Sequence, residues 1–201
     1  MLTADTATGT IAPMTDDELW ESLRSGDEQA FRALFERHHK AVYNVAFRHC
    51  ASWVQAEDAT QLAFTSVWRR ATITPPLPGL RAGAVRAWLC ALGRNEARNQ
   101  VRSSNRRLRL HSMAAAQPRS GERDDTANWV EAEAAMQRIN TVLGRVPDGQ
   151  RAVIELVWAG CNLAETAAAL DLPVGTVKSR LSRARKTLAT TEVAALLGEE
   201  N

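Results

Sequence analysis

Two separated groups of basic side chains are the residues of this chain best suited to binding a partner. The first runs from Arg94 to Arg109 with Glu96 as its only acid, and the second runs from Lys178 to Lys186 with no acid. Basic side chains gathered in this way neutralise the phosphates of a polyanion. The net charge of the 201 residues is only +2, so the distribution of charge carries the information. Two groups predict two separate contacts with one polyanion.

Residues 162–186 predict a helix-turn-helix that carries the second basic group on its second helix. Asn162 and Glu165 have the spacing of a capping box, which marks the start of a helix. Asp171 falls where the turn requires a left-handed backbone, and Pro173 suits the first turn of the helix that follows. In such motifs the second helix enters the major groove of DNA. The alternative is a basic surface helix that contacts only solvent.

The rest of the chain has helical periodicity, and no strand pattern stands out. Helices are expected from Thr15 to the Gly26–Asp27 break and then over 28–50, 55–71, 84–110, 127–145 and 150–159. Residues 1–14 are expected to be disordered, 111–126 to be a flexible linker, and 191–201 to be a C-terminal tail. The sequence therefore predicts an all-α fold of two small helical domains, 15–110 and 127–190, joined by the linker.

The first basic group has a regular arrangement on its expected helix. Arg94, Arg98 and Arg102 recur every four residues and should form a ridge along one face. Asn95 and Asn99 lie beside that ridge. Cations along a nucleic-acid strand, with amide side chains that can bond to a base edge, suit the capture of a single strand.

A polar stripe is expected on the helix over residues 55–71. Asp58, Gln61 and Thr65 share one face, and an apolar stripe occupies another. The stripe is either a docking surface or the solvated side of an amphipathic helix, and the spacing alone leaves both open.

Neither a metal site nor a catalytic site is expected. His38 and His39 are interpreted as surface histidines, and Glu57 and Asp58 have no third partner at a suitable spacing. No GxxxxGK[ST] motif is present, so Gly175 belongs to a turn rather than to a phosphate-binding loop. The expectation is a binding protein with no cofactor.

The three cysteines and the lengths of the apolar runs indicate in which cellular compartment the protein is expected. Cys50, Cys90 and Cys161 are expected to be buried, reduced thiols in helices, with a redox role left open. The first residues do not resemble a signal peptide, and no apolar run is as long as a membrane span. A cytoplasmic location is therefore expected.

The order of these elements resembles the extracytoplasmic-function, or group IV, sigma factors of the sigma-70 family. The resemblance extends from Asp27 to Leu188 and rests on the motifs AEDATQLAF, VRAWLCALGRNEARNQVRSSNRR and PVGTVKSRLSRAR. Members of this family keep regions 2 and 4, which correspond here to residues 15–110 and 127–190. Thr166 departs from the pattern where isoleucine is usual, and Asp171 departs where Gly or Asn is common.

The resemblance implies three sites. The face that docks on the clamp helices of the largest RNA polymerase subunit corresponds to Asp58, Gln61, Leu62 and Thr65. The part that opens the −10 element and holds its non-template strand corresponds to Arg94, Asn95, Arg98, Asn99 and Arg102. The positions that read the −35 element as duplex correspond to Thr176, Lys178, Ser179, Arg180, Ser182 and Arg183.

The resemblance also implies partners. They are core RNA polymerase, including the flap of its second-largest subunit, promoter DNA, and an anti-sigma factor that holds the protein inactive. A conventional helix-turn-helix regulator is the second interpretation, in which residues 15–110 sense a signal or dimerise. Such a regulator would bind duplex DNA by itself, commonly as a dimer on a palindrome.

Overall fold

The regular structure of the described residues is entirely helical. The computed structural model describes residues 14–72, 78–111 and 126–190, and within them it contains helices and no strand. The helices are α1 (Asp16–Arg24), α2 (Glu28–Cys50), α3 (Trp53–Thr72), α4 (Val85–His111), α5 (Thr126–Leu143), α6 (Asp148–Trp158), α7 (Leu163–Ala169) and α8 (Val174–Ala189). The all-α prediction is confirmed. The expected linker and C-terminal tail lie almost wholly outside the described residues.

Local side-chain caps explain where several helices begin. Thr15 and Glu18 form a capping box at α1, in which Oε2 of Glu18 accepts from the Thr15 amide at 2.7 Å. The carboxylate of Asp27 accepts from the amides of Gln29 and Ala30 and so caps α2. Each bond satisfies an amide that has no partner inside the helix.

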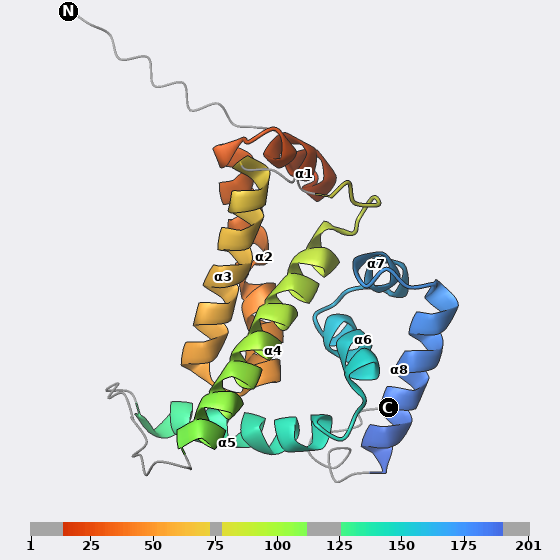
Figure 1. The fold of residues 1–201 in the computed structure, drawn as a ribbon. Coiled ribbons are helices and arrows are strands. Elements are labelled where there is room, and N and C mark those ends of the chain that lie inside the picture. The colour runs from red at the N-terminus through yellow and green to blue at the C-terminus, as the bar shows by residue number, and fades with distance from the viewer. Residues whose placement is uncertain (1–13, 73–77, 112–125, 191–201) are drawn as a thin grey trace, which may run out of the picture.

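Helices α1 to α4 form the first half of the molecule, in which α2, α3 and α4 pack lengthwise and α1 crosses one end (Figure 1). Trp20 is 1% exposed and meets Trp88 edge to face, with ring centroids 5.1 Å apart. Helices α2 and α4 approach so closely at Gly93 that a Cβ there would overlap Cγ1 of Val42. This close contact fixes the position of α4, which carries the first basic group.

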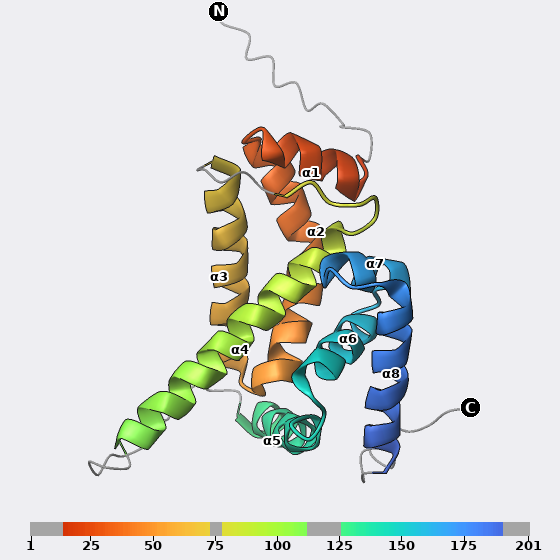
Figure 2. The same cartoon turned by 45° about the vertical axis from the view of Figure 1, so that its right-hand side comes forward.

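Helices α6 to α8 form the helix-turn-helix half, and α7 and α6 lie against α4 (Figure 2). Asn162 and Glu165 form the predicted capping box, and Asp171 has the predicted left-handed backbone with φ of 52°. A separate apolar cluster holds this half together, formed by Leu143, Val146, Val153, Ile154, Ala167, Val177, Leu181, Ala184 and Leu188.

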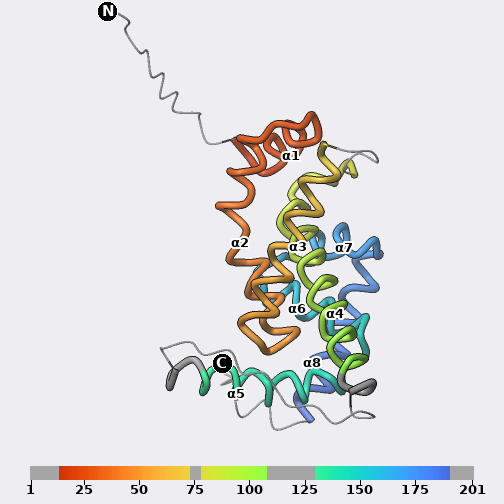
Figure 3. Tube along the Cα trace, turned by 60° about the vertical axis from the view of Figure 1, so that its left-hand side comes forward, coloured from red at the N-terminus to blue at the C-terminus, as the bar shows by residue number. Residues whose placement is uncertain are grey.

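Helix α5 passes beneath the end of α2, where the two halves of the chain meet (Figure 3). Oε1 of Glu133 accepts from the amide of Trp53 at 2.9 Å, and Nδ2 of Asn140 donates to the carbonyl of His49 at 2.7 Å. These bonds satisfy backbone groups at the start of α3 and the end of α2. The second half therefore supports the first through specific polar contacts.

The two halves also share one apolar core. Leu156, Ala159 and Cys161 belong to the same buried cluster as the side chains of α1 to α4. The sequence predicted two domains connected by a linker, and nothing in it indicated this common core. In the structure, the helix-turn-helix half instead packs against α4 across a buried surface.

Three expectations about single residues are wrong. Met14, assigned to the disordered start, packs against the core, and its carbonyl accepts from Arg37 at 2.7 Å. His38, interpreted as a surface residue, is 6% exposed and its Nε2 lies 2.7 Å from the carboxylate of Asp16. Cys161 lies in the loop between α6 and α7 rather than in a helix. Long-range packing decided the positions of Met14 and His38, whereas Cys161 lies past the end of α6, where Gly160 has a left-handed backbone.

None of the helices described by the structure combines the length and the apolar character needed to cross a membrane.

Candidate nucleic-acid interface

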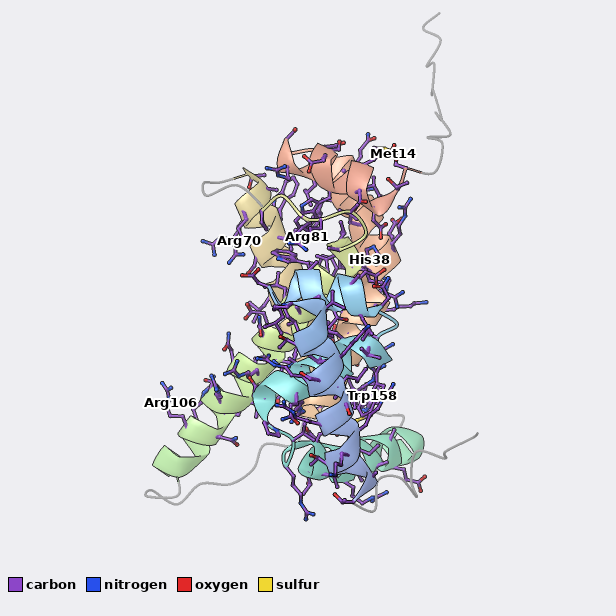
Figure 4. The ribbon with its side chains drawn as sticks, turned by 90° about the vertical axis from the view of Figure 1, so that its right-hand side faces the viewer. Met14, His38, Arg70, Arg81, Arg106 and Trp158 are labelled. Carbon is purple, nitrogen blue, oxygen red and sulfur yellow. The ribbon has the colours of Figure 1, made fainter. Side chains whose placement is uncertain are left out.

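Helix α8 separates its apolar and polar residues onto opposite sides. Val177, Leu181, Ala184 and Leu188 are buried against α6 and α7. The residues on the outward side are exposed, and they are Lys178, Ser179, Ser182, Arg183, Arg185 and Lys186. This side of α8 faces the viewer in Figure 4, with no other helix in front of it. An exposed helical face of cations and hydroxyls can enter a major groove and contact phosphates and base edges.

Two of the predicted duplex-reading residues are less exposed than the others. Thr176 is half-buried, and its carbonyl accepts from Oγ of Ser179 at 3.0 Å. Arg180 is also half-buried, because its guanidinium lies over Gly149 at the start of α6. The outward face is therefore centred on Ser179, Ser182 and Arg183 more than on Arg180.

The arginine ridge on α4 is only partly exposed. Asn95, Asn99 and Arg102 are exposed, and the C-terminal part of α4 extends away from the other helices (Figure 2). Arg94 is 3% exposed, so the predicted ridge is not open to solvent along its whole length. Arg98 is half-exposed, because its Nη1 lies 3.3 Å from the carboxylate of Asp148. The ridge passes from a buried end to an open end along the same helix.

Arg94 is covered because it is paired with carboxylates of α6. Its Nε donates to Oε2 of Glu155 at 2.6 Å, and its Nη2 donates to Oδ1 of Asp148 at 2.5 Å. A cation that suits a nucleic-acid phosphate is thus already bound to two anions of the helix-turn-helix half.

Glu155 is the centre of this ionic contact. It is fully buried, and its Oε1 accepts from Nε of Arg151 at 2.7 Å and lies 3.2 Å from Nδ1 of His49. Burial alone would raise the pKa of Glu155, but the hydrogen bond from His49 and the charges of Arg151 and Arg94 outweigh it and lower that pKa to about 2. Glu155 is therefore an anion that binds groups from α2, α4 and α6 together.

Asp148 strengthens the same contact at its solvent-facing edge. Partial burial would raise its pKa, but the hydrogen bond from Arg94 and the charges of Arg94 and Arg98 hold that pKa below its ordinary value. Asp148 also lies in the first turn of α6, where a negative charge is favoured by the helix dipole.

The predicted docking stripe on α3 lies on the open surface. Asp58, Gln61, Leu62 and Thr65 are all exposed, and Leu62 exposes 48% of its surface. Helix α3 lies on the side of α4 away from α6, α7 and α8 (Figure 1). The stripe is therefore accessible while the helix-turn-helix half covers Arg94.

The sequence reasoning missed the residues that join the two halves, which are His49, Asp148, Arg151 and Glu155. One signal could have indicated Glu155: it is the only acid within the apolar run AVIELVW. A carboxylate inside such a run has to be paired when it is buried. Arg151 is a partner at i,i+4 spacing, but no local pattern identifies Arg94 and His49, because they lie 61 and 106 residues away along the chain.

Comparisons with known proteins agree with this arrangement. The family model of sigma-70 region 2 matches residues 34–107, and that of sigma-70 region 4 matches residues 136–188. A helical region 2 followed by a region 4 helix-turn-helix defines a transcription initiation factor of the sigma-70 type.

Individual relatives narrow this class. The ECF RNA polymerase sigma factor SigM of Mycobacterium tuberculosis is 35% identical over 177 residues, covering 87% of this chain and 83% of its own. The ECF RNA polymerase sigma-E factor of Escherichia coli K12 is 28% identical over 184 residues, covering 87% and 93%. The chain belongs to the extracytoplasmic-function (ECF) RNA polymerase sigma factors.

Solved structures show the same fold. CnrH, solved in complex with the cytosolic domain of CnrY, matches with a TM-score of 0.61 and 26% identity over 92% of this chain and 99% of that one. The sigma factor RpoE of Bartonella quintana, solved in complex with the anti-sigma factor NepR, matches with a TM-score of 0.55 over 86% and 99%.

Proposed function

We propose that this ECF sigma factor binds core RNA polymerase through α3 and directs it to promoters that it reads with α8 and opens with α4. Asp58, Gln61, Leu62 and Thr65 form the proposed docking face for the clamp helices of the largest subunit. The flap of the second-largest subunit is the proposed contact of region 4. Residues 15–110 and 127–190 are the two functional units, and the site of action is the cytoplasm, where polymerase works.

The exposed outer face of α8 is the observation that carries this proposal. This face follows the short helix α7, which begins with a capping box, and the left-handed turn at Asp171. Its residues are Lys178, Ser179, Ser182 and Arg183. This geometry presents the N-terminal half of α8 to a major groove, where arginine and lysine bond to guanine and serine bonds to phosphate. Thr176 and Arg180 would contact the DNA backbone at the edges of this face.

The −10 contact requires a rearrangement. Asn95, Asn99, Arg98 and Arg102 can meet a single strand along α4, and Arg94 would join them only after α6 moves away from α4. Exposed amides suit the recognition of unstacked bases, and arginines suit the phosphates between them. Promoter opening would therefore accompany separation of the two regions.

Control by an inhibitory partner fits the same picture. The two structural neighbours were solved in complexes, one of them with an anti-sigma factor. An anti-sigma factor for this chain would bind the exposed stripe of α3, the outer face of α8, or both. Catalysis is not part of the proposal, and no cofactor is required.

Run-off transcription on a library of genomic fragments tests the proposal. Purified bacterial core polymerase is assayed with and without the full chain, and discrete start sites are expected only with it. Alignment of those start sites gives the two promoter elements directly. No initiation together with tight binding of the chain alone to duplex DNA would contradict the proposal and favour a conventional regulator.

A further inference from the structure

The side chains of Cys90 and Cys161 meet across the contact between region 2 and region 4. Cys90 belongs to α4 and is fully buried, and Cys161 lies in the loop after α6 and is 3% exposed. The two side chains belong to the core cluster that the regions share, and each thiol is the largest influence on the pKa of the other, so the two lie next to each other. Both are free thiols. One thiol from each region thus lies at the surface that separates when the regions part.

Two half-buried arginines, Arg86 and Arg48, lie close to this pair. Nη2 of Arg86 donates to the carbonyl of Ala159, which closely precedes Cys161 in the chain. Nε of Arg86 and Nη1 of Arg48 are buried and have no hydrogen-bond partner among the described residues. Nearby cations with unused N–H donors favour a thiolate over a neutral thiol. The positive charges of Arg86 and Arg48 therefore favour a thiolate within this buried pair.

The two thiols have different proton affinities. The hydrogen bond to Cys161 and burial both raise the pKa of Cys90 above its ordinary value. The hydrogen bond from Cys90 lowers the pKa of Cys161, and the charge of Arg86 lowers it further although burial opposes both. Cys161 is the nucleophile of the pair, and Cys90 holds the shared proton.

Cys50 provides an internal contrast. Burial raises the pKa of the Cys50 thiol, and its Sγ donates to the carbonyl of Ala46 at 3.0 Å. It lies at the end of α2, with no cysteine among its hydrogen-bond partners. It is the matched control for the experiments below.

We propose that Cys90 and Cys161 are a redox-active dithiol that a hydroperoxide oxidises to a disulfide between region 2 and region 4. The Cys161 thiolate attacks hydrogen peroxide, the O–O bond breaks, and the leaving hydroxide takes a proton to become water. The sulfur of Cys161 is then a sulfenic acid. Cys90 loses its proton and attacks that sulfur, the S–S bond forms, and the sulfenic oxygen leaves as a second water. Two thiols are oxidised by two electrons, and one peroxide is reduced to two waters.

The bond would hold region 4 on region 2. Cys161 follows α6, the helix that carries Glu155 and Asp148, so a disulfide to α4 keeps these carboxylates on Arg94. Oxidation would thereby prevent the separation that promoter opening requires, and a dithiol reductant would reverse it. This consequence rests on the proposed function, whereas the disulfide itself does not.

Thiol counting and peptide mapping test the chemistry. The reduced full chain is treated with hydrogen peroxide, quenched, and denatured, and its free thiols are counted and its peptides mapped without reduction. The expected result is a fall from three free thiols to one and a cross-linked peptide that joins Cys90 to Cys161. The Cys50→Ser variant leaves Cys90 and Cys161 unchanged and should give the same link. It therefore shows whether the link forms without the third thiol. Three remaining thiols, or a link that includes Cys50, would overturn the proposal.

Run-off transcription tests the consequence separately. The reduced chain is expected to be active, the oxidised chain inactive, and the oxidised chain treated with dithiothreitol active again. The Cys161→Ser variant should stay active through the same peroxide treatment. Full activity of the cross-linked chain would overturn the locking role. An inactive reduced chain that still forms the Cys90–Cys161 link would instead count against the proposed sigma-factor activity and leave the dithiol standing.

Discussion

Nε of Arg94 lies 2.6 Å from Oε2 of Glu155, and this pair joins region 2 to region 4. Arg94 is 3% exposed and Glu155 is not exposed at all. A buried pair of this kind depends strongly on both partners, because either one left alone would be an uncompensated charge away from water.

Replacing Glu155 by Gln should therefore be strongly destabilising. The substitution leaves Arg94 and Arg151 buried without their shared anion, and the free energy of unfolding should fall by about 3–5 kcal/mol. Urea denaturation followed by circular dichroism measures this change. Glu36→Gln is the control, since Glu36 is exposed on α2 and its loss should change stability by less than about 0.5 kcal/mol. A loss in E155Q no larger than in the control would show that the pair does not hold the regions together.

The carboxylate of Glu155 should also make the free energy of unfolding depend on pH. The pKa of Glu155 is lowered from 4.5 to about 2 in the folded chain, so its contribution is complete above pH 4.5 and is lost as the pH falls towards 2. The contribution is on the order of 3 kcal/mol. Asp148 acts in the same direction, because its pKa is also lowered. Denaturation midpoints measured from pH 7 down to pH 3 should fall more steeply for the wild-type chain than for E155Q, and parallel curves would exclude Glu155 as the cause.

Arg183→Ala should reduce discrimination among −35 sequences. Arg183 is exposed on the outer face of α8, and loss of a contact to a base should cost ~1–3 kcal/mol at one promoter position. Arg185→Ala is a matched control because it removes the same charge from the same helix, next to the buried row and away from the centre of the outer face. Transcription from promoters with single substitutions in the −35 element measures the preference. Equal loss of preference in both variants would show that Arg183 contributes only charge.

Asn95→Ala should impair promoter opening more than duplex binding. Asn95 is exposed beside the arginines of α4, where an amide can bond to an unpaired base. Permanganate reactivity of thymines in the −10 element measures opening, and a mobility-shift assay of the holoenzyme measures binding. Asn105→Ala, at another exposed position of α4, should leave both unchanged. Equal losses of opening and binding in N95A would contradict a role in strand capture.

Leu62→Ala should weaken the complex with core polymerase. Leu62 is an apolar side chain exposed at the centre of the polar stripe on α3, and burying it in an interface should contribute about 1–2 kcal/mol. Val130→Ala is the control because Val130 is also apolar and exposed but lies on α5 rather than on α3. Titration of labelled protein with core polymerase gives both affinities. An unchanged affinity for L62A would leave the stripe as a solvated helix face.

The sequence predicted those parts of the fold that depend on neighbouring residues. The capping boxes at Thr15 and Asn162 and the left-handed turn at Asp171 follow from spacings of a few residues, and all three are confirmed. The predicted helix over 28–50 coincides with α2. Local backbone hydrogen bonds and caps decide such features, so a single sequence is sufficient to find them.

The contact between the two regions could not be predicted in this way. The ridge spacing of Arg94, Arg98 and Arg102 was correct, but nothing near Arg94 indicates that Glu155 would cover it. Cys90 and Cys161 likewise have no sequence pattern that joins them, because tertiary packing brings them together. Exposure of a side chain depends on segments far away along the chain, and helical periodicity gives only the face on which it lies.

The pairing of Arg94 with Glu155 and Asp148 has a consequence for how promoters compete for this protein. The two carboxylates bind Arg94 as DNA phosphates would in the proposed function, so there Arg94 reaches a strand only by exchanging one set of anions for another. The cost of that exchange is set within the protein and is the same at every promoter. In the proposed function, this cost lowers every promoter affinity by one common factor and leaves the ranking of promoters to α8 and to the asparagines of α4.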